Sequence, residues 1–380
     1  MIFRRQISLS KLWVLLAVSL IIAFFIEMHD KSLALSGRKS DHILTFFLIV
    51  LLSMYGGLRV WYNDTITYIG VYNNLTPTLK EFFQSDSVSI INGWGFSFLN
   101  SIIKTLGFSS QDFLMLYAFL TVIPYVLFVR KYCPHFIFGV FLMFTTGFYS
   151  FTFAAIKQCM ATGICLLAVM AALDRKWVRY FLLIGLAFLF HPYSIVYLIV
   201  PFMMFRPWTR RTYIYILVFL IAGFALDSML GTILDVTDLI GANYDAESFA
   251  GEGVNIFRVL VAFVPLVLSF PYKSILFVDS DKSENLMFNL AMVHALIMFV
   301  GLFGTANYFA RLANYFLPAV VVVLPWMLNK LYYKHRPFLK FSCVVGYMGY
   351  FYYGNAVQHS FDLYFSQISL WTYISSHFNG

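Results

Sequence analysis

The chain has 380 residues, of which 61% are hydrophobic and only 12% are charged. This composition leaves no room for a soluble domain beside a membrane-embedded one. The formal net charge of +8 would suit a nucleic-acid-binding protein, but the basic residues are dispersed in short loops between apolar runs. We therefore attribute the charge to the bias of cytoplasmic loops toward Lys and Arg, and expect no nucleic-acid partner.

The apolar runs are continuous and show no two-residue alternation, which predicts helices rather than strands. We expect an all-α, polytopic membrane helix bundle of about 11–12 spans in one integral-membrane domain, residues 1–380. The first run follows basic residues as a signal peptide would, but no small-residue cleavage site follows it, so we expect a retained span. The expected spans are about 12–28, 42–58, 112–129, 135–153, 155–173, 178–190, 192–205, 212–229, 256–272, 286–304, 311–329 and 338–356.

The topology depends on how the chain behaves at His191-Pro192. A single span over 178–205 would place the basic stretch 206–211 outside and the acidic loop 231–255 in the cytoplasm. Two short spans that meet at Pro192 reverse both positions, which agrees with the positive-inside bias, and proline breaks a helix. This second topology puts the N-terminus outside, and a cytoplasmic N-terminus is the main alternative.

The long outer segment 59–111 is rich in aromatic and aliphatic residues, which indicates one or two amphipathic helices that lie in the membrane interface or dip back into the membrane. Under this topology, basic residues also lie at the outer ends of the spans. These are Arg59, Lys80, Lys104, Lys157, Arg258 and Arg311.

Four polar groups from separate parts of the chain converge on the outer face. They are Arg59 with Asp64 and Tyr68; Lys157 with Gln158; His191; and Arg311 with Asn314 and Tyr315. Structural roles are also open: Arg59 and Arg311 as span-end anchors, Asp64 as a helix cap, and His191 as a neutral imidazole bonded to backbone. A charge inside a span, as at Lys157, points to function.

The segments that carry these groups are LRVWYNDTITYIGVYN, NGWGFSFLNSIIKTLGF, AAIKQCMATGICLLAVMAALDRKWVRYFLLIGLAFLFHPYSIVYLIVP and NYFARLANYFLPAVVVVLP. In order and spacing, over about residues 40–330, the chain resembles the EpsG-like family of bacterial Wzy-type polysaccharide polymerases. Two positions depart from the pattern. Lys157 stands where an arginine precedes the glutamine, and Asn63 stands where a glycine precedes the aspartate.

The resemblance implies a glycosyltransferase that polymerises undecaprenyl-diphosphate-linked oligosaccharides into O-antigen or exopolysaccharide. The site would face the periplasm at the bacterial inner membrane. Partners would be these lipid-linked oligosaccharides, membrane lipids and a chain-length regulator protein, without a metal or other cofactor. Arg59, Lys157 and Arg311 would bind the leaving diphosphate, and Tyr68, Gln158, Asn314 and Tyr315 would bind substrate. Asp64 and His191 are the two candidates for the base, and the ordinary pKa of histidine favours His191.

Other functions fit parts of the sequence. A flippase or exporter of lipid-linked oligosaccharides would place charges near the membrane midplane and show internal repeats, and neither is visible. An O-antigen ligase would have a large late outer loop, whereas the one at 305–310 is short. Asp279-Ser280-Asp281 matches the DxD pattern of nucleotide-sugar enzymes. We expect this loop on the cytoplasmic side and interpret the match as a chance occurrence. His294 could relay protons, although a satisfied core histidine is the favoured interpretation.

Overall fold

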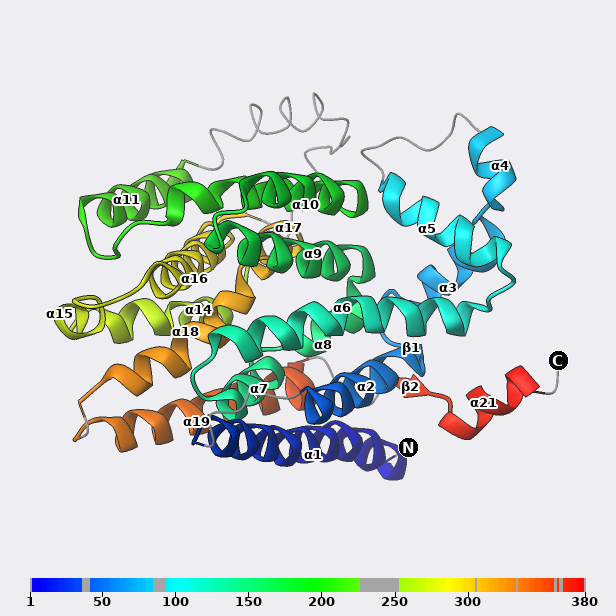
Figure 1. Ribbon diagram of the computed structural model, residues 1–380, viewed down its shortest axis with the longest axis horizontal. Coiled ribbons are helices and arrows are strands. Elements are labelled where there is room, and N and C mark those ends of the chain that lie inside the picture. The colour runs from blue at the N-terminus through cyan, green and yellow to red at the C-terminus, as the bar shows by residue number, and fades with distance from the viewer. Residues whose placement is uncertain are drawn as a thin grey trace.

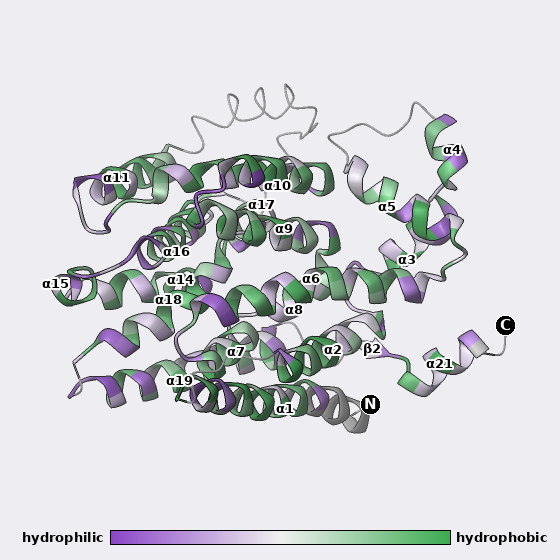
Figure 2. Cartoon of the chain, viewed as in Figure 1, coloured by the Kyte–Doolittle hydropathy of each residue, from purple (hydrophilic) through white to green (hydrophobic). Residues whose placement is uncertain are grey.

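The computed structural model describes residues 2–35, 42–84, 93–225, 253–304, 306–332, 334–358, 361 and 365–378. Most helices run side by side across the bundle, so that polar connections gather at its two ends (Figure 1). Coloured by hydropathy, the helices are mainly hydrophobic along their length, and hydrophilic residues concentrate toward both ends (Figure 2). The all-α expectation is confirmed.

In the part of the chain described, the elements follow one another along the sequence. They are α1 (Ile2–Leu35), α2 (Ile43–Gly57), β1 (Arg59–Trp61), α3 (Thr65–Asn74), α4 (Leu79–Gln84), α5 (Trp94–Thr105), α6 (Ser110–Tyr132), α7 (Phe136–Thr145), α8 (Phe148–Ala154), α9 (Ile156–Leu173), α10 (Trp177–Phe190), the 3-10 helix η2 (Pro192–Met203), α11 (Arg210–Phe224), α14 (Ile256–Ser269), α15 (Lys273–Leu276), α16 (Lys282–Val300), α17 (Ala306–Asn314), α18 (Leu317–Lys330), α19 (Arg336–Tyr352), the π-helix η3 (Tyr353–Gln358), β2 (Ser366–Gln367) and α21 (Leu370–Phe378).

Four helices of the described residues are long and apolar enough to cross a membrane, and six segments qualify if each of two bent pairs is one span. The bent pairs, α7 with α8 and α17 with α18, turn by 46° and 52°. Within the described residues, each expected span coincides with a helix or a bent pair, but 135–153 and 311–329 are broken rather than continuous. Residues 226–229 of the expected span 212–229 lie outside the described residues. The chain is a polytopic membrane helix bundle.

The chain reverses direction at His191-Pro192. The hydroxyl of Tyr180 in α10 donates a hydrogen bond of 2.6 Å to the carbonyl of Tyr197 in η2. A continuous helix would separate positions 17 residues apart by about 25 Å, so the two segments form a hairpin. The expectation of two segments meeting at this point is confirmed, whereas most of the acidic loop 231–255 lies outside the described residues.

The two bent pairs have local causes. Gly147, between α7 and α8, has a φ of 80°, a left-handed conformation that glycine adopts without steric cost. Pro318 stands at the start of α18, where its missing N–H costs nothing. Breaks of this kind free carbonyl groups that need new donors inside a membrane.

Side chains of neighbouring helices satisfy the carbonyls at the α17–α18 break. Because one of these donors is His294, its role is that of a satisfied core histidine. The three contacts run from Gln158 Nε2 to the Arg311 carbonyl (2.5 Å), from His294 Nδ1 to the Ala313 carbonyl (2.8 Å) and from the Tyr197 hydroxyl to the Tyr315 carbonyl (2.5 Å).

A two-stranded antiparallel sheet, formed by β1 and β2, closes the end of the bundle that carries α3 to α5 (Figure 1). Beyond β2, the Tyr373 hydroxyl donates a hydrogen bond of 2.6 Å to Asp112 at the start of α6. The sheet thus ties the segment after α2 to a distant part of the chain.

Cysteine labelling tests the orientation of the bundle. In a chain without its four native cysteines, we expect a cysteine at the exposed Lys80 to react with an impermeant maleimide in intact cells. A cysteine at the exposed Thr209, in the basic stretch, should react only after permeabilisation. The opposite pattern would invert the topology and place the α3–α5 end in the cytoplasm.

Candidate functional site

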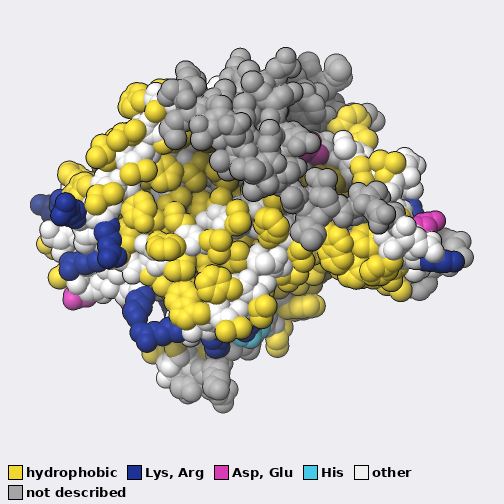
Figure 3. All heavy atoms as spheres, turned by 90° about the horizontal axis from the view of Figure 1, so that it is seen from above, with side chains coloured by type: hydrophobic (Ala, Val, Ile, Leu, Met, Phe, Trp, Pro, Cys, Tyr) yellow, Lys and Arg dark blue, Asp and Glu magenta, His cyan; other side chains and the backbone are white. Residues whose placement is uncertain are grey.

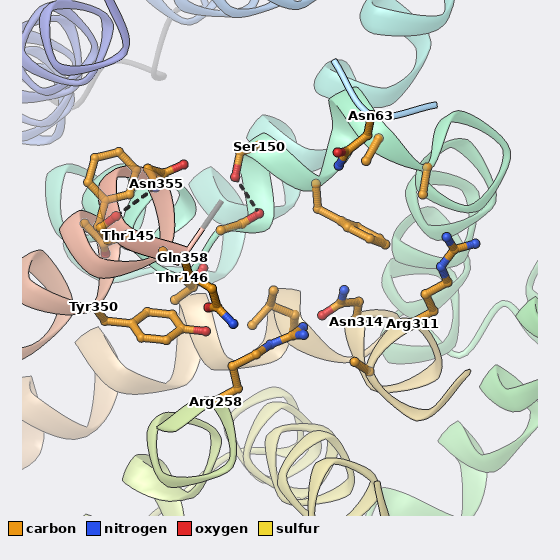
Figure 4. Close-up of a pocket in the computed structure, with 18 of the residues that line it drawn as sticks. Asn63, Thr145, Thr146, Ser150, Arg258, Arg311, Asn314, Tyr350, Asn355 and Gln358 are labelled. Atoms are coloured by element: carbon orange, nitrogen blue, oxygen red, sulfur yellow. Dashed lines mark hydrogen bonds between the residues drawn. The ribbon is translucent and has the colours of Figure 1, made fainter. Parts of the chain in front are cut away.

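A cavity of about 730 Å³ lies where several helices break or end. Its wall includes the α7–α8 break, the junction of α8 with α9, the α17–α18 break, the turn between β1 and α3, and η3. Irregular backbone inside a membrane is tolerated where it lines a cavity of this kind. The polar and charged lining residues are Tyr62, Asn63, Asp64, Thr145, Thr146, Ser150, Arg258, Arg311, Asn314, Tyr350, Asn355 and Gln358, of which all but Tyr62 and Asp64 are labelled in Figure 4.

Three charged side chains in this wall lack a partner of opposite charge. Asp64, Arg258 and Arg311 form no ion pair with any residue of the described ranges. Asp64 precedes the first residue of α3, yet its side chain makes no capping hydrogen bond. A carboxylate and two guanidinium groups are therefore available to a ligand in one cavity.

The turn before α3 places Asp64. Asn63 has a φ of 43°, in the left-handed region that asparagine tolerates better than most residues other than glycine. The position thus requires a conformation for which glycine is best suited. The asparagine at this position is compatible with the same turn.

Two helix N-termini add positive potential to the cavity. The lining residues Ala154 and Ala155 precede α9, and Leu317 is the first residue of α18. The first N–H groups of a helix have no partner within it and carry the positive end of the helix dipole. With Arg258 and Arg311, the cavity is suited to an anionic group.

The expectation that Arg59, Lys157, His191 and Arg311 line one cavity is wrong, because only Arg311 belongs to this wall. Asp64 and Asn314, two other predicted site residues, line it as well. The other predicted site residues do not line the cavity but lie close to its wall.

Arg59 is buried, with 2% of its surface exposed, and borders a separate space of about 10 Å³. Its guanidinium donates hydrogen bonds to the Gly56 carbonyl (2.5 Å) and to the Thr65 hydroxyl (3.2 Å), and lies 5.8 Å from the centre of the Phe153 ring. Arg59 thereby joins the end of α2 to the start of α3, next to Asp64. These contacts support a positioning role instead of the expected diphosphate contact.

We expect Arg59→Ala to destabilise the protein by roughly 2–4 kcal/mol, because it removes charged hydrogen bonds and leaves buried acceptors unsatisfied. The loss should appear as a lower melting temperature of the purified protein in detergent. Lys80→Ala, on the exposed side of α4, is the matched control. A melting temperature like that of the wild type would show that Arg59 does not hold the turn.

Tyr68 lies between the turn and α9. Burial raises the pKa of Tyr68 to about 12, and the negative charge of Asp64 adds to the rise. The backbone N–H of Lys157 and the charge of Arg311 act on the same pKa in the opposite direction. Tyr68 therefore lies close to the cavity residues Asp64 and Arg311 and also to Lys157 in the first turn of α9.

The other predicted residues lie near Arg311 but outside the cavity wall. His191 Nδ1 lies 2.7 Å from the hydroxyl of the buried Tyr315, and the charges of Lys157 and Arg311 act on its ring. Lys157 Nζ lies 4.8 Å from the centre of the Phe96 ring. Gln158 is occupied by the Arg311 carbonyl. His191 and Gln158 thus both contact the segment 311–315, which carries Arg311.

The DxD pattern has a structural role in its own part of the chain. Asp281 caps α16 by accepting a hydrogen bond of 2.8 Å from the Glu284 N–H, and Glu284 bonds back to the Asp281 N–H. Within the described ranges, no group of three or more His, Cys, Asp or Glu residues is arranged to hold a metal ion.

Sequence reasoning missed Arg258 and the wall formed by Tyr350, Asn355 and Gln358. Arg258 was recognised only as a basic residue at the outer end of a span, since no motif surrounds it. The polar residues after Tyr352 interrupt an apolar run, which is the signal that could have indicated the end of α19 and the π-helix.

The family model of the EpsG family matches residues 42–375. This range includes every residue that lines the cavity. No curated protein and no solved structure matches the chain.

Proposed function

Because the chain belongs to the EpsG family, whose members are Wzy-like polymerases, we propose that it polymerises oligosaccharide units carried on undecaprenyl diphosphate. The product would be O-antigen or exopolysaccharide, made at the outer face of the bacterial inner membrane. The observation that carries this proposal is the cavity with one carboxylate and two guanidinium groups that form no ion pair with a described residue.

In the proposed reaction, a sugar hydroxyl of the acceptor attacks the anomeric carbon of the donor. A new carbon–oxygen bond forms as the bond from that carbon to the diphosphate oxygen breaks. The hydroxyl proton passes to a base of the enzyme, and the lipid diphosphate leaves with the electron pair. Its developing negative charge is stabilised by preorganised cations and N–H groups, here Arg311 and the N-terminus of α9.

Asp64 is the better placed of the two candidate bases. It lines the cavity and its carboxylate has no charged partner among the described residues, so it can approach a substrate hydroxyl. His191 does not line the cavity, and its Nδ1 atom lies within hydrogen-bond distance of the Tyr315 hydroxyl. We assign His191 the role of holding Tyr315 beside the α17–α18 break.

The other predicted residues support Arg311 in binding the leaving diphosphate. Asn314 lines the cavity beside Arg311 and can bind a sugar hydroxyl or a phosphate oxygen. Gln158 holds the backbone of Arg311, and Tyr68 lies near its charge. Lys157 contributes a second positive charge at the start of α9, so Lys157→Arg should retain substantial activity.

The surface polysaccharide of a strain that lacks the protein tests the proposed function. A polymerase defect leaves one capped repeat unit at the cell surface. A complete loss of polysaccharide would identify a flippase or exporter, and a lipid-linked polymer without attachment would identify a ligase. Either of these two outcomes would overturn the proposal. A chain-length regulator remains the expected protein partner.

A further inference from the structure

Arg258 and Arg311 occupy different parts of the same cavity. Arg311 comes from α17 and Arg258 from the first turn of α14. In Figure 4 they lie on opposite sides of Asn314, and the two guanidinium groups point in different directions.

The surroundings of the two arginines differ. Arg311 interacts electrostatically with Tyr68, and so does Asp64. Arg258 interacts with the hydroxyl of Tyr350. Gln358 lines the same cavity, and in the view of Figure 4 it lies on the same side of Asn314 as Arg258. Among the described residues, Asp64 is the only acidic one in the wall, so one described carboxylate shares the cavity with two cations.

The position of Arg258 is electrostatically unfavourable without a ligand. It is in the first turn of α14, where the positive end of the helix dipole disfavours a cation. No described acidic residue pairs with it. Its neighbours Tyr350 and Gln358 are neutral and can donate hydrogen bonds to an anion together with the guanidinium.

We infer that the cavity has two oxyanion subsites, one at Arg311 for the leaving diphosphate and a second at Arg258, Tyr350 and Gln358 for the diphosphate of the second lipid-linked substrate. This inference rests on the proposed function, in which donor and acceptor are both lipid diphosphates and must be held at the same time. Both subsites belong to the wall of the same cavity of about 730 Å³.

Counting bound farnesyl diphosphate tests the inference. The purified protein in lipid nanodiscs is titrated calorimetrically, and native mass spectrometry gives the number of molecules bound. We expect two for the wild type, one for Arg258→Gln, one for Arg311→Gln and none for the double variant. Arg258→Lys should restore the second molecule, because it keeps the charge, and Lys80→Gln should still bind two.

Two results would overturn the inference while leaving the proposed function intact. One is a single bound molecule in the wild type that both single variants lose, which means one diphosphate bridges the two arginines. The other is two bound molecules in Arg258→Gln. Absence of saturable binding to a folded wild type would overturn the proposed function and the inference together.

Discussion

Arg311→Ala is expected to slow polymerisation about 100- to 1,000-fold, because a fixed cation at a developing oxyanion contributes roughly 3–4 kcal/mol to the barrier. Arg311 is exposed and forms no ion pair with a described residue, so its loss should leave the fold unchanged. Its carbonyl, which Gln158 holds, remains in the variant. The initial rate is measured in nanodiscs, with lipid-linked repeat units extracted from a strain that lacks the protein.

Lys80→Ala is the matched control, since it removes an exposed cation that does not line the cavity. Its rate should equal that of the wild type. If Arg311→Ala were as active as this control while both variants kept the wild-type melting temperature, the diphosphate would not contact Arg311. The electrostatic mechanism would then be wrong.

Asp64→Asn is expected to reduce the rate about 100- to 10,000-fold, the usual contribution of a general base. The amide keeps the size and polarity of the side chain but cannot take up the hydroxyl proton. Because the Asp64 side chain caps no helix, the melting temperature should stay the same. The rate and the melting temperature together separate chemistry from folding.

His191→Gln provides the comparison that decides between the two candidate bases. Glutamine can accept the hydrogen bond that the Tyr315 hydroxyl shares with His191, so we expect most of the activity to remain. A large loss in His191→Gln together with full activity in Asp64→Asn would return the role of base to His191.

The bundle itself followed from the sequence alone. Continuous apolar runs can satisfy their backbone inside a bilayer only as helices, so every expected span has its helix or bent pair. The order of the motifs indicated the family, and Asp64, Arg311 and Asn314 were recognised by their type and position. The reversal at His191-Pro192 was also predictable, because proline ends a helix and the loop charges required it.

Only the tertiary structure decided which cations face the cavity. Each residue turns the helix by about 100°, and a helix that is apolar on all sides gives no periodic signal of the face it presents. The helix breaks were equally hidden, since Gly147 and Pro318 lie within apolar runs. Packing buried Arg59 behind the turn that it supports, and it brought Arg258 from a distant helix into the cavity.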